Sequence, residues 1–167
     1  MRIFIKDLLR YVKSHLIKKD KRFPKLSLDK ILEILTSSYF NKLCEADYYL
    51  YFQKTIFLTV LANPKRVSEF QGFSLSKSGF KYSEITLQTH NKFVKKNATA
   101  TYSPTDVKTA EFSENMLFCP VHNLRKYLEI TDTLCQDNNI CRPDQLFINM
   151  DGSPITKHQL RASIKIL

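Results

Sequence analysis

One stretch organises the whole chain: Thr55 to Phe73, with the sequence TIFLTVLANPKRVSEFQGF. Its first half is apolar enough to lie in a core, and residues 45–62 are predicted to form one long helix. Asn63-Pro64 then interrupts this helix, because Asn favours the N-cap and Pro the first position of a new helix. We therefore expect a second, short helix with Arg66 in its first turn. The apolar side chains that we expect to be buried on the long helix are Tyr48, Tyr49, Phe52, Ile56, Phe57, Val60 and Leu61.

The first turn of a helix is an unusual place for Arg66, because a positive charge there opposes the helix dipole. Two interpretations are open. In the first, the guanidinium and the free N–H groups of the helix start bind an anion such as phosphate together. In the second, Arg66 forms an ordinary surface ion pair with Glu69, one turn further on.

The composition indicates one folded domain with a basic surface. The chain has 167 residues, 43% of them apolar, and a net charge of +10 with a pI near 9.5. This charge favours a polyanionic partner, with nucleic acid ahead of acidic membrane, although a basic surface on a protein with another task is the alternative. No apolar run reaches membrane-spanning length or has the form of a signal peptide, so we expect neither membrane insertion nor secretion.

Further helices are predicted from apolar spacing and capping signals. Two lie in the first part of the chain, over residues 2–18 and 27–35. Another begins with Pro120 at its first position, and a last helix follows the capping box Thr156-x-x-Gln159. The side chains expected on the buried face of the helix that begins at Pro120 are Val121, Leu124, Leu128 and Thr131.

After Gly79 the pattern changes to the alternation that is typical of strands. Strand candidates are residues 85–88, 93–96 and 107–112, with a turn over 97–104 and a short extended segment at 146–148. The sequence therefore predicts an α+β fold that is mainly α-helical and contains a small antiparallel sheet.

Three segments resemble the tyrosine recombinases, the phage-integrase family. Residues 61–70, LANPKRVSEF, are similar to the family segment L-A-x-G-x-R-x-S-E-L. Residues 119–128, CPVHNLRKYL, resemble the C-P-V-x-x-L-x-x-Y-L helix of DIRS-like retrotransposons and Crypton elements, and residues 93–97 resemble a further motif, F-x-x-K-[TN]-Q. The resemblance implies an integrase-like catalytic core with a three-stranded sheet over residues 26–167. Residues 1–25 are then the junction from a core-binding domain.

The resemblance also implies roles for a few side chains. The family's first catalytic arginine, which contacts the scissile phosphate, corresponds to Arg66. The family's general-acid lysine lies on the turn between the second and third strands, where Lys96 is the better match and Lys95 an alternative. Lys65 and Lys95 are expected to contact DNA. Without the family context, the two hairpin lysines would protect a sheet edge.

Part of the family's catalytic set has no clear counterpart. His158-Gln159-Leu160-Arg161 spells the family's His-x-x-Arg, and its i, i+3 spacing puts both side chains on one helix face. We interpret it as accidental, because the family places this helix before its His-x-x-Arg pair. No tyrosine follows Tyr127, so the expected nucleophile has no candidate. Cleavage through a 3′-phosphotyrosine needs that nucleophile, so we expect a truncated recombinase that does not cleave DNA.

A zinc site is the alternative reading of the cysteines. Cys119-x-x-His122, with Cys135 and Cys141, offers four ligands, but the last two are too far apart in sequence for a zinc knuckle. These three cysteines and Cys44 are the four cysteines of the chain, and all are expected to be reduced thiols. We expect no metal, and the family uses no cofactor.

The sequence thus favours the DNA-binding part of a tyrosine site-specific recombinase of a mobile element, with double-stranded DNA as partner. Self-association on DNA is a further expectation, and the nucleus is the expected location for a eukaryotic mobile element. Two alternatives stay open: a domesticated DNA-binding module without cleavage activity, and a small helical protein–protein adaptor.

Overall fold

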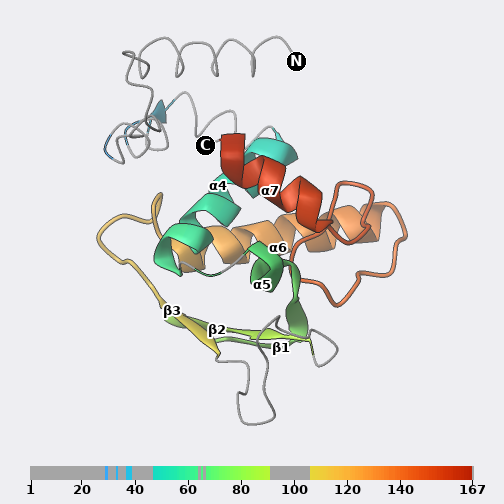
Figure 1. Cartoon of the computed structure of the whole chain (residues 1–167), viewed down its shortest axis with the longest axis horizontal. Helices are drawn as coiled ribbons and strands as arrows, with labels where there is room; N and C mark the ends of the chain where they lie inside the picture. The colour runs from blue at the N-terminus through green and yellow to red at the C-terminus, as the bar shows by residue number, and fades with distance from the viewer. Residues whose placement is uncertain are drawn as a thin grey trace.

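The computed structural model describes residues 47–63, 65, 67–90 and 106–166, and four single residues before them: Asp29, Glu33, Ser37 and Ser38. These residues contain four helices and one three-stranded antiparallel sheet, so the predicted α+β class is confirmed. The helices lie on one side of the sheet, with the short α5 nearest to it (Figure 1). Of the two helices expected near the N-terminus, residues 2–18 lie outside the described residues. In the second, the described residues Asp29 and Glu33 have helical backbone.

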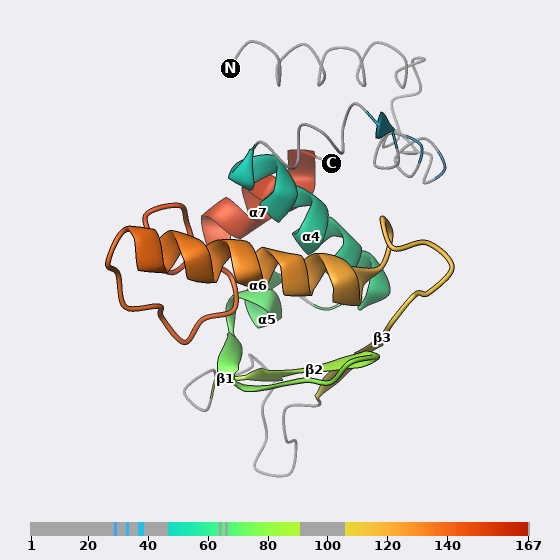
Figure 2. The same ribbon diagram turned by 180° about the vertical axis from the view of Figure 1, so that it is seen from behind.

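Helix α4, Tyr48–Ala62, is the centre of the fold. It begins three residues later than predicted, because the Asp47 carboxylate accepts hydrogen bonds from the N–H groups of Tyr49 and Leu50 and caps the helix there. Helix α6 packs on it and α7 also contacts it (Figure 2), so its middle is buried on nearly all sides.

The single apolar stripe predicted for α4 is therefore only partly correct. Phe52 and Ile56 are buried as expected, but Tyr49 is 41% and Leu61 46% exposed. Both exposed residues lie near the ends of α4, where the surrounding helices no longer cover it. Residues that the stripe left out, including the polar Gln53 and Lys54, are buried instead.

Helix α6, Pro120–Asp137, begins at the proline as predicted, with Cys119 as its N-cap. Its Tyr127 ring lies 6.0 Å from the Phe52 ring of α4 and 5.7 Å from the Phe147 ring, measured between centroids. Aromatic packing of this kind stabilises the contact beyond the area that it buries. Three segments far apart in the sequence therefore meet in one aromatic cluster.

The sheet contains β1 (Phe73–Phe80), β2 (Glu84–Thr89) and β3 (Val107–Ala110), in that spatial order. Strand β2 was predicted, and β3 ends at Ala110 rather than at residue 112. Strand β1 was not predicted, because its pairing is interrupted between Ser74 and Gly79, which breaks the alternation of apolar residues. The expected strand over residues 93–96 lies outside the described residues.

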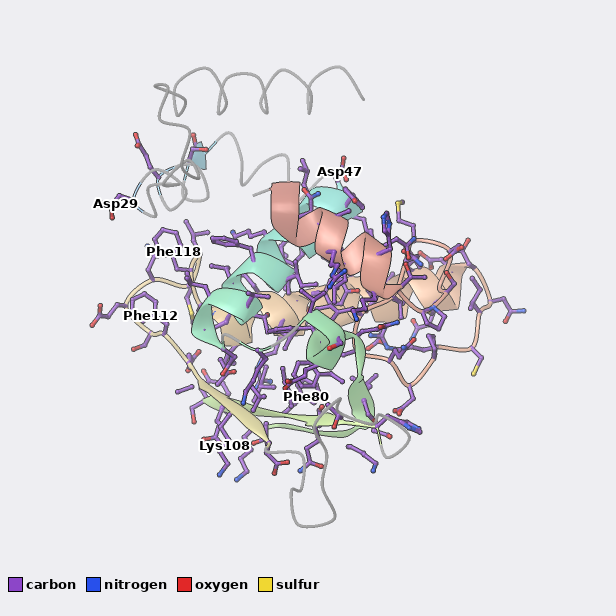
Figure 3. The ribbon with its side chains drawn as sticks, in the orientation of Figure 1. Asp29, Asp47, Phe80, Lys108, Phe112 and Phe118 are labelled. Atoms are coloured by element: carbon purple, nitrogen blue, oxygen red, sulfur yellow. The ribbon has the colours of Figure 1, made fainter. Side chains whose placement is uncertain are left out.

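The two faces of the sheet differ. Ile85, Leu87 and Val107 are buried under the helices, and Figure 3 shows Phe80 on the same side, between the sheet and α5. On β3 the side chains alternate strictly, so that Lys108 is exposed between two buried neighbours. The sheet therefore presents one polar face away from the helices.

The last part of the chain is an extended segment followed by α7, Lys157–Ile166. Residues 146–148 are buried and the chain turns at Gly152, whose φ of +75° suits glycine. The predicted capping box is present: Gln159 Oε1 accepts from the Thr156 N–H at 2.9 Å, and Thr156 Oγ1 accepts from the Gln159 N–H at 3.3 Å. Among the helices described here, none is long and apolar enough to cross a membrane.

Candidate nucleic-acid interface

The connection between α4 and α5 carries the segment that resembles the recombinase motif. Helix α5 covers Val67–Gln71, so it starts later than the Asn63-Pro64 pair predicts. The prediction that Asn63 is the N-cap of the second helix is wrong. Asn63 is the C-cap of α4 instead, with a non-helical backbone (φ −139°, ψ 88°) and its N–H bonded to the Thr59 carbonyl.

Lys65 is exposed in this connection, and its N–H donates to the Asn63 carbonyl oxygen at 2.7 Å. It is the one predicted site residue that the structure describes. Arg66, Lys95 and Lys96 lie outside the described residues. The described residues that flank them in the chain are Lys65 and Val67 for Arg66, and His90 and Asp106 for the two lysines.

Two hydrogen bonds tie the ends of the α5 region to the sheet. Before α5, the Asn63 side-chain amide donates to Thr109 Oγ1 of β3 at 2.6 Å. After α5, the His90 N–H at the end of β2 donates to the Gly72 carbonyl at 2.8 Å. Residues 91–105, which include Lys95 and Lys96, connect β2 to β3. The Lys65 turn is thus bonded to β3, and Gly72 after α5 is bonded to the end of β2. The part of the chain with the two lysines runs between these two strands.

The charges around this part of the sheet are mixed rather than uniformly positive. Lys65 and Lys108 are exposed, but so is Asp106, at the start of β3. Asp106 Oδ2 accepts a hydrogen bond at 2.9 Å from the side-chain amide of Gln88 on β2. This bond ties together the ends of β2 and β3 from which the connecting residues leave, and it engages one oxygen of the carboxylate.

His158 and Arg161, the residues of the His-x-x-Arg sequence, are both exposed on α7, which packs against α5 as well as α4. Their spacing puts them on one helix face, as the sequence indicates. Their exposure is the ordinary state of polar side chains on a helix that buries Leu160. No described contact links either residue to the Lys65 turn, and the interpretation that the pair is accidental stays a prediction.

The last tyrosine of the chain, Tyr127, is fully buried and hydrogen-bonded. Its hydroxyl accepts from the Ile148 N–H at 3.0 Å and lies 3.1 Å from the Tyr48 hydroxyl, which donates to the Ile148 carbonyl at 2.7 Å. Burial raises the pKa of both phenols above the ordinary value of a tyrosine. A hydroxyl so enclosed cannot attack a DNA phosphate, so Tyr127 serves the fold.

The cysteine thiols of the zinc alternative do not converge. The Cys119 sulfur is buried at the start of α6, where it accepts hydrogen bonds from the N–H groups of Phe112 and His122 at 3.2 and 3.4 Å. Cys135 is buried and Cys141 exposed. Across the part of the chain that the structure describes, no three His, Cys, Asp or Glu side chains gather closely enough to hold a metal ion.

A pocket of about 450 Å³ opens where the start of β1, His90 and residues 143–145 meet. Its charged wall is Asp144, whose two carboxylate oxygens accept from the Ser74 hydroxyl at 2.6 Å and the Ser76 N–H at 2.8 Å. These hydrogen bonds lower the pKa of the Asp144 carboxyl, so it is ionised at neutral pH. A fixed negative charge makes this pocket a poor site for a phosphate group.

Comparison with protein-family models, with curated protein sequences and with solved structures gives no significant match to the chain. The motifs of the sequence and the geometry of the α4–α5 connection are therefore the observations from which a function is proposed.

The sequence did not predict the hydrogen bond between Asn63 and Thr109. Asn63 was noticed as a helix cap, but its partner lies 46 residues further along the chain on β3. The signal that existed was the alternation of β3, which predicts that Val107 and Thr109 face the helices together. A threonine on the buried face of a strand needs a hydrogen-bond partner, and that need could have pointed to a polar residue opposite.

Proposed function

We propose that this chain binds double-stranded DNA as part of a tyrosine site-specific recombinase of a mobile element. The interface is formed by the α4–α5 connection with Lys65 and Arg66 and by the β2–β3 connection with Lys95 and Lys96. In this proposal Arg66 contacts a backbone phosphate, Lys96 is the general-acid lysine, and Lys65 and Lys95 supply further phosphate contacts. The proposal includes no strand cleavage by these 167 residues and no metal or nucleotide cofactor.

One observation carries the proposal. The two segments that match the family motifs at these positions join the same sheet, although they are about thirty residues apart. The first is bonded to β3 through Asn63 and Thr109, and the second connects β2 to β3. A net charge of +10 supports a polyanionic partner. Phosphate contacts by such cations provide affinity without sequence specificity.

The test is the salt dependence of DNA binding by the purified chain, followed by fluorescence anisotropy with labelled duplexes. Each neutralised phosphate contributes about −0.9 to the slope of log K against log salt, so we expect a slope of about −3 or steeper. Arg66→Ala and Lys96→Ala should each weaken binding and reduce the steepness by about one. Lys157→Ala, which removes an exposed lysine from α7, is the matched control and should leave the slope unchanged.

The outcomes separate the competing functions. If no duplex binds even at low ionic strength, the protein–protein adaptor becomes the better explanation. If the chain binds DNA and forms a covalent adduct on nicked suicide substrates, the proposal that these residues do not cleave is wrong. A domesticated DNA-binding module shares the salt dependence, and it is favoured if Arg66→Ala and Lys96→Ala behave like the Lys157→Ala control.

A further inference from the structure

The hydrogen bond between Asn63 and Thr109 joins the two parts of the structure that the proposed interface uses. It spans 2.6 Å between the amide nitrogen of Asn63, at the end of α4, and the hydroxyl oxygen of Thr109, on β3. Thr109 is 7% exposed and faces the helices, so it cannot contact DNA itself. Any effect of Thr109 on DNA binding must therefore pass through the residues that it holds.

The contacts continue from Thr109 to Lys65 in two steps. The Asn63 side chain is bonded to Thr109, and the Asn63 carbonyl accepts a hydrogen bond from the Lys65 N–H at 2.7 Å. Asn63 is the C-cap of α4 and its backbone angles are not helical, although its N–H still donates to the Thr59 carbonyl at 3.1 Å. That helical hydrogen bond holds the Asn63 backbone N–H, and the bond to β3 holds its side chain. The exposed Lys65 side chain begins two residues after this anchored position.

We propose that Thr109 is a positioning residue for DNA binding: through Asn63, it holds the turn that presents Lys65 to the DNA backbone. A turn that is ordered before DNA arrives loses less conformational entropy on binding, and this improves affinity without adding a contact. This inference rests on the proposed function, because it assumes that Lys65 contacts a phosphate.

The first test replaces Thr109 by valine, which has nearly the same shape but no hydroxyl. We expect Thr109→Val to weaken duplex binding about three- to tenfold at moderate salt, and Thr109→Ser to restore it. Thr131→Val is the matched control, because Thr131 is also a buried threonine whose hydroxyl bonds within α6, to the Leu128 carbonyl. If Thr109→Val does not fold, Asn63→Ala removes the donor of the same hydrogen bond, at a residue that is only half-buried.

A double-mutant cycle distinguishes positioning from general destabilisation. Lys65→Ala alone should weaken binding, and adding Thr109→Val to it should change the affinity by less than about twofold, because the positioned group is already gone. If Thr109→Val weakens binding equally in both backgrounds, or not at all in the native one, the positioning role is wrong although the protein binds DNA. If the native chain shows no salt-dependent binding, the proposed function fails, and the inference fails with it.

Discussion

Helix α4 contributes to two regions that are held together in different ways. Its middle is packed among aromatic and aliphatic side chains of α6 and residues 146–148, where Phe52 and Ile56 are completely or almost completely buried. Its last turn leads into the exposed Lys65 connection, which is tied to the sheet by the hydrogen bond between Asn63 and Thr109. Burial of apolar area provides most of the folding energy, whereas a single hydrogen bond contributes little net stability but fixes orientation. We therefore expect changes in the first region to affect stability and changes in the second to affect DNA binding.

The largest expected effect is in the aromatic cluster. Phe52→Ala should lower the free energy of unfolding by about 3–5 kcal/mol, because it leaves a cavity between Tyr127 and Phe147. Urea denaturation followed by circular dichroism measures this loss. Tyr82→Ala, at a position that is 87% exposed, is the control and should change stability by about 0.5 kcal/mol or less. A loss below about 1 kcal/mol for Phe52→Ala would mean that this cluster is not the core.

The next effect concerns a buried amide that organises the start of α6. The Asn123 amide nitrogen donates to the carbonyls of Cys119 and Leu117 at 2.8 and 3.2 Å, and its oxygen accepts from the Tyr51 hydroxyl at 3.3 Å. Asn123→Ala removes three side-chain hydrogen bonds from a buried site, although the Tyr51 hydroxyl and the Cys119 carbonyl keep bonds to the Asn123 backbone, so we expect a loss of about 2 kcal/mol in the same denaturation experiment. Asn138→Ala, at the exposed end of α6, should cost about 0.5 kcal/mol or less. Equal losses for the two variants would contradict the buried network.

Alkaline pH should destabilise the core through Tyr48 and Tyr127. Burial raises the pKa of both phenols, so the folded chain keeps two protons that the unfolded chain loses near pH 10. The folded state then binds more protons, and stability falls as pH rises above about 10, by about 1.4 kcal/mol per pH unit for each tyrosine. Below pH 10 this contribution is fully present.

Denaturation midpoints measured between pH 9 and pH 11 test this expectation. Tyr127→Phe should reduce the slope above pH 10 to about half, since one of the two buried phenols is gone. Tyr82→Phe removes a phenol that is exposed and should leave the slope unchanged. An identical slope in the native chain and in Tyr127→Phe would show that the buried phenols do not cause the effect.

The smallest effect on stability is expected where the effect on binding is largest. Lys65→Glu changes an exposed side chain and should alter the free energy of unfolding by about 0.5 kcal/mol or less. It also reverses a charge in the proposed DNA interface and should weaken duplex binding more than Lys65→Ala does. The same reversal at Lys157 is the control. If both reversals weaken binding equally, the effect of Lys65 reflects net charge rather than a local contact.

Local sequence signals correctly predicted where two of the helices begin. Pro120 begins α6 and the Thr156–Gln159 capping box begins α7, because both act within one turn of the chain. Strand β1 escaped prediction because its pairing with β2 is interrupted between Ser74 and Gly79, where Ser74 and Ser76 bond to Asp144, about 70 residues away. For the candidate site, the sequence pointed to Lys65, but it did not indicate the hydrogen bond from Asn63 to Thr109 that anchors the start of this connection.

The sequence by itself determined the α+β class, the long apolar helix before Asn63, and the basic character of the chain, since each depends on local spacing or on total charge. Only the tertiary structure decided which surface of α4 is covered and what Asn63 does. Asn63 leaves the helical conformation because Pro64 follows it, and only the fold decided that its side chain bonds a hydroxyl on β3 instead of capping the next helix. Capping preference is worth about 1 kcal/mol, so one long-range hydrogen bond of similar energy is enough to change its outcome.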